Sequence, residues 1–157
     1  MLSTSSLCRA PDWEERLAVF LDRKREEPFK WGSHDCALFA ADAIKAMTGT
    51  DPGEAFRDTY SDRAGSALAL RDLGAGTLLK TVTAWLGAPK HPAFAQRGDI
   101  VMKDRNTLGV CVGLHSWFVG EEHGHNGLVA LPTAHCTKAF TLPYATAASS
   151  TEIRADV

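Results

Sequence analysis

The sequence lacks the features that mark several special classes of protein. No apolar run approaches the roughly 18 residues that a membrane-spanning helix needs. Residues 1–9 contain neither a basic start nor an apolar core, so we do not expect a secretion signal. The formal net charge is only −2 at pH 7, which gives no electrostatic reason for binding nucleic acid or an anionic membrane. We therefore expect a globular domain with no nucleic-acid partner and no membrane span.

Cysteine is sparse, and its spacing is not that of the common metal sites. The chain has four cysteines and no Cys-x-x-Cys pair. Their wide spacing and the lack of a secretion signal favour free thiols. A metal or redox site would require Cys111, His135 and Cys136 to converge with a further ligand. Because adjacent residues of a strand point to opposite faces, this is the weakest of the alternatives, and we expect no metal and no cofactor.

The length and composition favour a single domain. Of the 157 residues, 45% are hydrophobic and 23% are charged, which is ordinary for a globular protein. No internal repeat is present. We expect a flexible N-terminal arm over residues 1–10, one domain over residues 11–143, and a loose C-terminal tail, rich in Ala, Ser and Thr, over residues 144–157.

Helical periodicity dominates the first half of the chain. We expect Asp12 to cap a helix, with Glu15 completing a capping box and Pro28 ending the helix. Its apolar face consists of Trp13, Leu17, Phe20 and Leu21, and its opposite face is highly charged. A second helix is expected over residues 36–47 and ends at Gly49. Because it is rich in alanine, we expect it to be central and buried. Three further helical segments are expected: a short one from Asp51-Pro52, and two near residues 65–73 and 77–86.

After Gly98 the pattern changes to short strands separated by turn residues. The expected strands cover residues 99–102, 108–114, 117–119, 128–131 and 139–142. Their spacing predicts an antiparallel meander. Helices followed by strands indicate an α+β fold, in which N-terminal helices, including the one that begins at Cys36, pack on a C-terminal antiparallel sheet of about five short strands.

The most informative segment is Phe29-Lys30-Trp31-Gly32-Ser33-His34-Asp35-Cys36. It places a cysteine directly after a Trp-Gly turn and at the first position of a buried helix. The backbone N–H groups and the positive end of the helix dipole at that position favour the thiolate. Cys36 is therefore a candidate nucleophile.

This segment, followed later by Arg97-Gly98-Asp99-Ile100-Val101 and Gly109-Val110-Cys111-Val112-Gly113, resembles the NlpC-type cell-wall peptidases. These are papain-fold cysteine enzymes that cut peptidoglycan stem peptides, and the likeness covers residues 12–142. Within the superfamily the chain is most similar to phage and prophage proteins encoded among tail-tip genes. It shares with them Phe-x-Trp-Gly-x-x-Asp-Cys at 29–36, Ala-Asp at 41–42 and Thr-Gly-x-Asp-Pro at 48–52. The resemblance implies that residues 11–143 form an NlpC-like domain with a papain-like fold.

The resemblance carries over unevenly to the catalytic positions. It implies that Cys36 occupies the nucleophile position, that Asp35 caps the helix, and that Trp31 and Gly32 form the supporting turn. The strand that opens with the catalytic histidine in the family opens here with Thr107. The next strand, which supplies the third polar residue in the family, offers only Phe118, Val119 and Gly120.

Another histidine is a candidate for the role of the missing base. If segments 107–114 and 116–122 form a hairpin that turns near Leu114-His115, Thr107 faces Glu122 or His123. Directly opposed residues point to the same side of a sheet, so His123, or His125 beside it, would lie near the thiol. The competing interpretation is that both histidines belong to a solvent-facing turn.

The resemblance, together with the residues at the catalytic positions, implies two alternative functions. The leading one is a structural or assembly component of a phage tail tip or baseplate with a degenerate NlpC-type peptidase fold. Its partners would be other tail proteins, and it would reside in the host cytoplasm during assembly and then in the virion. The alternative is an active cysteine hydrolase of peptidoglycan stem peptides that uses Cys36 with His123 or His125 during cell-wall penetration.

Overall fold

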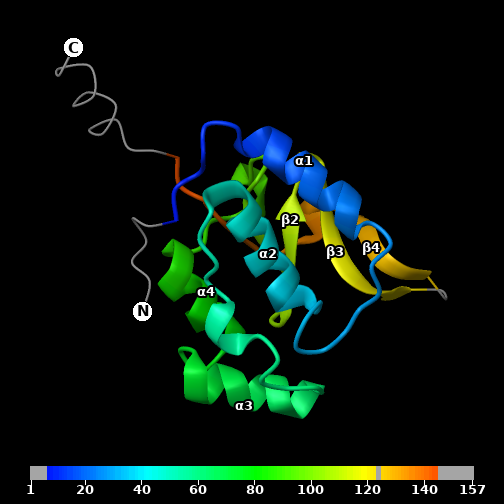
Figure 1. Cartoon of the computed structure of the whole chain (residues 1–157). Helices are drawn as coiled ribbons and strands as arrows, with labels where there is room; N and C mark the ends of the chain where they lie inside the picture. The colour runs from blue at the N-terminus through cyan, green and yellow to red at the C-terminus, as the bar shows by residue number, and fades with distance from the viewer. Residues whose placement is uncertain (1–6, 123–124, 145–157) are drawn as a thin grey trace.

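The computed structural model describes residues 7–122 and 125–144, and the fold over these residues is α+β, as expected (Figure 1). The four α-helices are α1 (Trp13–Lys24), α2 (Cys36–Thr48), α3 (Arg63–Leu73) and α4 (Leu78–Leu86). Three short 3₁₀ helices are η2 (Glu54–Phe56), η3 (Pro92–Phe94) and η4 (Thr133–His135). The strands are β1 (Ile100–Lys103), β2 (Thr107–Cys111), β3 (His115–Glu122), β4 (His125–Pro132) and β5 (Lys138–Phe140).

The five strands form one antiparallel sheet in the order β4-β3-β2-β1-β5. The first four strands follow one another as the expected meander. The last strand departs from that pattern, because β5 returns to pair with β1, with Val101 opposite Ala139. Lys90 then makes two backbone hydrogen bonds with Ala139 and covers part of the β5 edge.

Helix α2 is central, as its alanine content predicts, and lies between α1 and the sheet (Figure 1). Ala40, Ala41 and Ala43 are fully buried, so the helix backbone approaches its neighbours closely. Phe39 stacks on Phe20 of α1 at 5.7 Å between ring centroids. Gly49 ends the helix in the left-handed conformation with φ 85°. The main core therefore fills the layer between the helices and one face of the sheet.

Helix α1 begins where the sequence predicts but ends earlier, and its expected capping box is wrong. The Asp12 side chain makes no capping hydrogen bond; its carboxylate instead pairs with Arg16 at 2.8 Å. The helix ends at Lys24 rather than at Pro28. The Arg25 carbonyl accepts a hydrogen bond from the backbone N–H of Leu128 in β4. Because this carbonyl pairs with the sheet, the helix does not continue past it.

The helix expected from Asp51-Pro52 is shorter than predicted and begins at Glu54. Asp51 accepts a hydrogen bond from the Gly53 N–H at 2.9 Å and pairs with Arg57 at 2.8 Å. The same guanidinium contacts Asp42 at 2.6 Å. The two aspartates therefore serve to bind the η2 segment to α2.

Residues 7–10 are packed against the domain, which corrects the expectation of a flexible arm over this part of residues 1–10. Leu7 is fully buried, and the buried Arg9 guanidinium pairs with Asp99 at 2.9 Å. The same group lies between the rings of Trp13 and Tyr144, at 4.2 and 4.3 Å from their centroids. The rest of the expected arm, residues 1–6, and residues 145–157 of the expected tail lie outside the described residues.

The opposite face of the sheet carries a second, smaller apolar cluster. Its members are Val101, Cys111, Phe118, Cys136 and Ala139. Within residues 7–122 and 125–144, no helix is both long and apolar enough to cross a bilayer.

Candidate functional site

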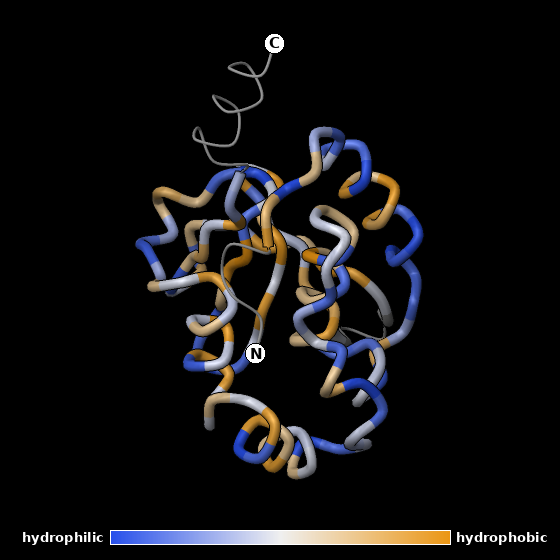
Figure 2. Tube along the Cα trace, turned by 60° about the vertical axis from the view of Figure 1, so that its left-hand side comes forward, coloured by the Kyte–Doolittle hydropathy of each residue, from blue (hydrophilic) through white to orange (hydrophobic). Residues whose placement is uncertain are grey.

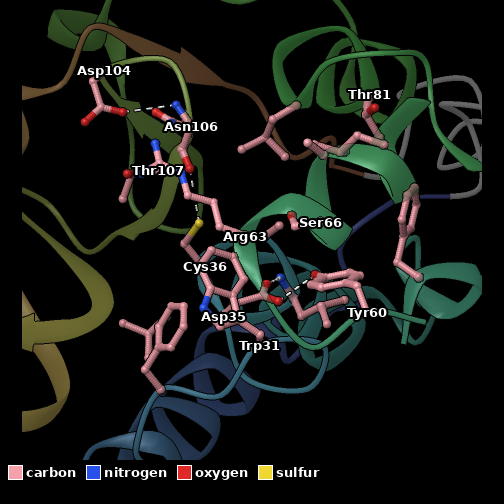
Figure 3. A pocket seen from close by; sticks show the side chains of 18 of the residues that line it. Trp31, Asp35, Cys36, Tyr60, Arg63, Ser66, Thr81, Asp104, Asn106 and Thr107 are labelled. Atoms are coloured by element: carbon pink, nitrogen blue, oxygen red, sulfur yellow. Dashed lines mark hydrogen bonds between the residues drawn. The ribbon is translucent and has the colours of Figure 1, made fainter. Parts of the chain in front are cut away.

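A pocket of about 500 Å³ lies between the start of α2, the turn joining β1 and β2, and helices α3 and α4 (Figure 3). Its wall is mostly apolar and aromatic. The main contributors are Phe29, Trp31, Leu38, Phe56, Tyr60, Leu70, Leu78, Trp85 and Val119. Its polar groups include Cys36, Arg63, Asn106 and Thr107. The candidate nucleophile therefore opens onto a cavity rather than onto the packed core.

Asp35 organises the start of α2, and its expected capping role is confirmed. Its carboxylate accepts hydrogen bonds from the Leu38 N–H at 2.9 Å, the Gly32 N–H at 3.0 Å and the Tyr60 hydroxyl at 2.5 Å. Asp35 is buried, so these bonds offset the cost of removing its charge from water. One side chain thereby fixes the turn, the helix start and the far wall of the pocket.

The Trp31-Gly32 turn requires glycine for two reasons. Gly32 has φ 84°, a conformation that side chains disfavour. A Cβ at this position would also meet the Tyr60 carbonyl oxygen at 2.1 Å. Trp31 then stands at the pocket wall, where its ring makes an edge contact with Phe29 at 4.9 Å between centroids.

Cys36 is the first residue of α2, but its thiol is not poised to ionise. Burial raises its pKa to about 11, and the charge of Asp35 adds to the rise. The backbone N–H groups of Leu108 and Ala37 act in the opposite direction and are outweighed. The thiol is instead a donor to the Asn106 carbonyl at 3.3 Å. The N–H groups at the helix start thus act in the expected direction, but burial outweighs them and the thiol stays protonated.

Thr107 opens β2 and lines the same pocket as Cys36. The strand position that resemblance assigns to a histidine is thus placed beside the thiol, and it carries a hydroxyl. No histidine is among the described residues that line this pocket.

The expected hairpin register is wrong, and with it the argument for His123. Val110 pairs with Trp117, and Cys111 pairs with Ser116. This register, continued, brings Gly120 opposite Thr107, three residues before His123. The turn comes earlier in the chain than predicted, because β2 ends at Cys111 and β3 already begins at His115.

Of the two candidate bases, only His125 is among the described residues. His123 itself is outside the described residues. His125 is the first residue of β4, where its backbone pairs with Glu122.

His34 is buried but is not among the residues that line the pocket. Its Nδ1 lies 3.1 Å from a carboxylate oxygen of Glu27, and its ring packs edge-on against Phe39. Burial lowers the pKa of His34, although Glu27 opposes the shift. It is a core histidine.

Helix α3 contributes one wall of the pocket, which was not predicted from the sequence. Arg63, Ser66, Ala67 and Leu70 all line the pocket, and their spacing is that of one helix face. Tyr60, just before the helix, binds Asp35, and burial together with this bond raises the pKa of the Tyr60 hydroxyl. The helical spacing was visible in the sequence, but nothing in it indicated that the face lines a cavity.

Cys111, His135 and Cys136 do not form a metal site. Over residues 7–122 and 125–144, no group of three or more His, Cys, Asp or Glu side chains is arranged to hold a metal ion. The Cys111 thiol is a donor to the Gly113 carbonyl at 3.3 Å. Burial, with Cys111 as a smaller contributor, raises the pKa of Cys136 to about 11. Both are buried thiols on the far side of the sheet from the pocket.

Comparison with known proteins gives a family for this architecture. No curated protein and no solved structure matches the chain. Residues 8–142 match the model of a family described as "Domain of unknown function (DUF6950)". The match begins at the segment held by Arg9 and ends at Leu142, so it spans both the pocket and the sheet. Because it covers most of the chain, the protein belongs to the DUF6950 family.

Proposed function

We propose that this chain is a non-catalytic domain with a papain-like, NlpC-type fold, and that it serves as a structural component of a phage tail tip or baseplate. One observation carries the proposal. Thr107, at the strand position where resemblance implies a histidine, lines the same pocket as a Cys36 thiol whose pKa is about 11. The position of the nucleophile is kept, and the group that would activate it is replaced.

The chemistry of the thiol argues against hydrolysis. At pH 7, a thiol with a pKa of about 11 is ionised in only about one molecule in ten thousand. Amide cleavage also needs a group that protonates the leaving amine. Cys36 instead donates a hydrogen bond to the Asn106 carbonyl, and the Asp35 carboxylate accepts from three neutral donors.

The placement in a tail tip rests on the motifs shared with the tail-tip proteins. The structure gives two of these motifs architectural roles, since Asp42 and Asp51 both bind Arg57. Other tail proteins would be the partners, and the charged face of α1 is the surface offered to them. Its exposed members include Asp22 and Arg23. The protein would lie in the host cytoplasm during assembly and in the virion afterwards.

The catalytic half of the proposal is tested with purified peptidoglycan. Wild type and Cys36→Ala are incubated with it beside a muramidase as positive control, and released fragments are separated by mass. We expect neither protein to release stem-peptide fragments. Release by wild type that is lost in both Cys36→Ala and His123→Ala would establish the alternative, an active cysteine hydrolase with a displaced base.

The Thr107 observation has its own test. Thr107→His places an imidazole beside the thiol and should raise the rate of Cys36 alkylation at pH 7 by about tenfold or more, because a neighbouring imidazolium favours the thiolate. Thr107→Gln is the matched control of similar size. Equal rates in the two variants would mean that residue 107 does not face Cys36.

The structural half is tested on particles. Tail particles from a host that encodes the chain are purified and labelled with antibody to it for electron microscopy. Label at one end of the tail is expected, and particles that lack the protein would refute the assignment.

A further inference from the structure

Helix α3 forms one side of the pocket and is only lightly packed on the rest of the fold. It lies at the edge of the molecule, at the bottom of Figures 1 and 2, and its trace alternates hydrophobic and hydrophilic residues. Ala69 is its only buried residue, whereas Leu68 and Leu73 are 48% and 49% exposed. Leu70 lines the pocket. The face of α3 that carries Ala67 and Leu70 therefore lines the cavity, and Leu70 also packs against the edge of the core.

The chamber beneath α3 suits a compact hydrophobic group. Trp31, Leu70 and Trp85 border it from three different parts of the chain, and Phe56 supports Trp85 through an edge contact at 6.4 Å between centroids. A volume of about 500 Å³ lies within the range of small-molecule sites, about 300–1,000 Å³.

The rim of the chamber carries an unpaired cation. Arg63 lines the pocket, is exposed, and makes no ion pair with any residue that the structure describes. In Figure 3 its side chain extends from α3 toward Asn106 and the Cys36 thiol. The side chains of Asn106 and Thr107 line the same rim and likewise have no hydrogen-bond partner among the described residues.

Two carboxylates, those of Asp35 and Asp104, also line the pocket. Asp35 is buried and accepts its three hydrogen bonds from neutral groups. Asp104 accepts from the Asn106 N–H at 3.0 Å and lies on the far side of Asn106 from the thiol in Figure 3. Neither carboxylate pairs with Arg63, so its five N–H donors remain available to an anionic oxygen.

We propose that this pocket binds a hydrophobic carboxylate, with the apolar body between Trp31, Leu70 and Trp85 and the carboxylate on Arg63. A free aliphatic acid and the C-terminal hydrophobic residue of a peptide share this chemistry. The inference rests on the proposed function in one respect: without an activated thiol, the ligand is held unchanged. Binding would also order α3, because Leu70 and Ala67 would gain an apolar contact on the side that faces the cavity.

The test compares matched ligands that differ only in charge. Octanoate is titrated against 1-octanol, and acetyl-Gly-Gly-Phe with a free carboxyl end against its amide, by calorimetry and by tryptophan fluorescence. Trp31 and Trp85 report on the chamber. We expect octanoate, the free peptide or both to bind at least about tenfold more tightly than the uncharged partner, the size of effect that a charge-assisted hydrogen bond produces. Whether octanoate or the free peptide binds shows whether the carboxylate belongs to an aliphatic acid or to a peptide C-terminus.

Three variants test whether the ligand occupies this site. Arg63→Gln should reduce carboxylate affinity to that of the uncharged ligand, whereas Arg71→Gln removes a charge from the same helix outside the pocket and should have no effect. Ala67→Trp, at an exposed position of α3 that lines the pocket, should fill the chamber and abolish binding of all four ligands. Hydrogen exchange should slow in α3 of the wild type when ligand is present.

The outcomes separate this proposal from the previous one. Equal affinity for the charged and uncharged ligands, or equal losses in Arg63→Gln and Arg71→Gln, would overturn it. No binding by any ligand would do the same and would leave the non-catalytic role intact. Peptidoglycan cleavage that depends on Cys36 would overturn that role and leave the binding result intact.

Discussion

At Cys36, two physical effects compete and burial is the larger. The helix start supplies N–H groups and a dipole that favour a negative charge, effects worth about 0.3–1 kcal/mol near a surface. Removing the thiolate from water beside the buried carboxylate of Asp35 costs more, and the pKa rises to about 11. A cysteine at a helix start is therefore not necessarily a nucleophile. Its exposure and its neighbouring charges determine whether the thiol ionises.

Alkylation kinetics should reveal this balance directly. The rate of iodoacetamide reaction at Cys36, followed by peptide mass mapping, should rise through an inflection near pH 11, because only the thiolate reacts. The sign follows from the raised pKa: the protonated thiol persists at a pH where an ordinary cysteine, with a pKa of about 8.5, is ionised. Cys36→Ser gives the background rate. An inflection at or below pH 8.5 would show a stabilised thiolate and contradict this account.

Helices and strands were largely predictable from the sequence because their periodicities are local. The alanine-rich stretch and Gly49 mark α2 closely, and its Asp35 cap was implied by the resemblance to the NlpC-type peptidases. The pairing register was not predictable, because it depends on where the chain turns between Cys111 and His115. A turn slightly earlier than expected moved the residue opposite Thr107 from Glu122 or His123 to Gly120. The argument for His123 as the base was wrong for this reason, because the position of a residue on a neighbouring strand depends on the register.

Two aspartate caps in the chain allow the contribution of Asp35 to be measured. Asp35 is buried and binds three donors, whereas Asp62 caps α3 through the Gly65 N–H alone at 2.7 Å and is exposed. Asp35→Ala should lower the free energy of unfolding by about 2–4 kcal/mol, since it leaves buried donors unpaired. Asp62→Ala should cost about 1 kcal/mol. Urea denaturation measures both.

Equal losses in the two variants would mean that the Gly32 and Tyr60 bonds of Asp35 add nothing to its capping role. A loss in Asp35→Ala that Tyr60→Phe reproduces in part would instead apportion the effect between the helix cap and the bond to Tyr60.

At the scale of the whole molecule, the least predictable feature is the set of contacts around Arg9, which we call the clamp. A single arginine near the N-terminus gives no sign of burial. Its partners are Asp99, the Leu142 carbonyl and the rings of Trp13 and Tyr144, and most of them lie far away in the sequence. Lys90 also contacts Asp99, at 2.8 Å. The clamp closes the domain by joining its first and last described segments.

Arg9→Met should destabilise the fold strongly. The change leaves the buried Asp99 with Lys90 as its only ionic partner, and breaking a buried ion pair costs about 3–5 kcal/mol. Arg16→Met removes an arginine from the half-exposed pair with Asp12 and should cost less than about 1 kcal/mol. Thermal and urea unfolding of both variants measure the difference. Similar losses would show that the Arg9 pair contributes no more than a surface pair.

The clamp also determines how the domain would respond to mechanical load. The Arg9 N–H donates to the Pro143 carbonyl at 2.8 Å, so the two ends of the described chain leave the domain side by side. Tension applied through neighbours attached at these ends would act first on the buried Leu7 and on the Arg9 contacts. These contacts would break before the sheet carried the load, and the pocket beneath α3 would keep its shape until then.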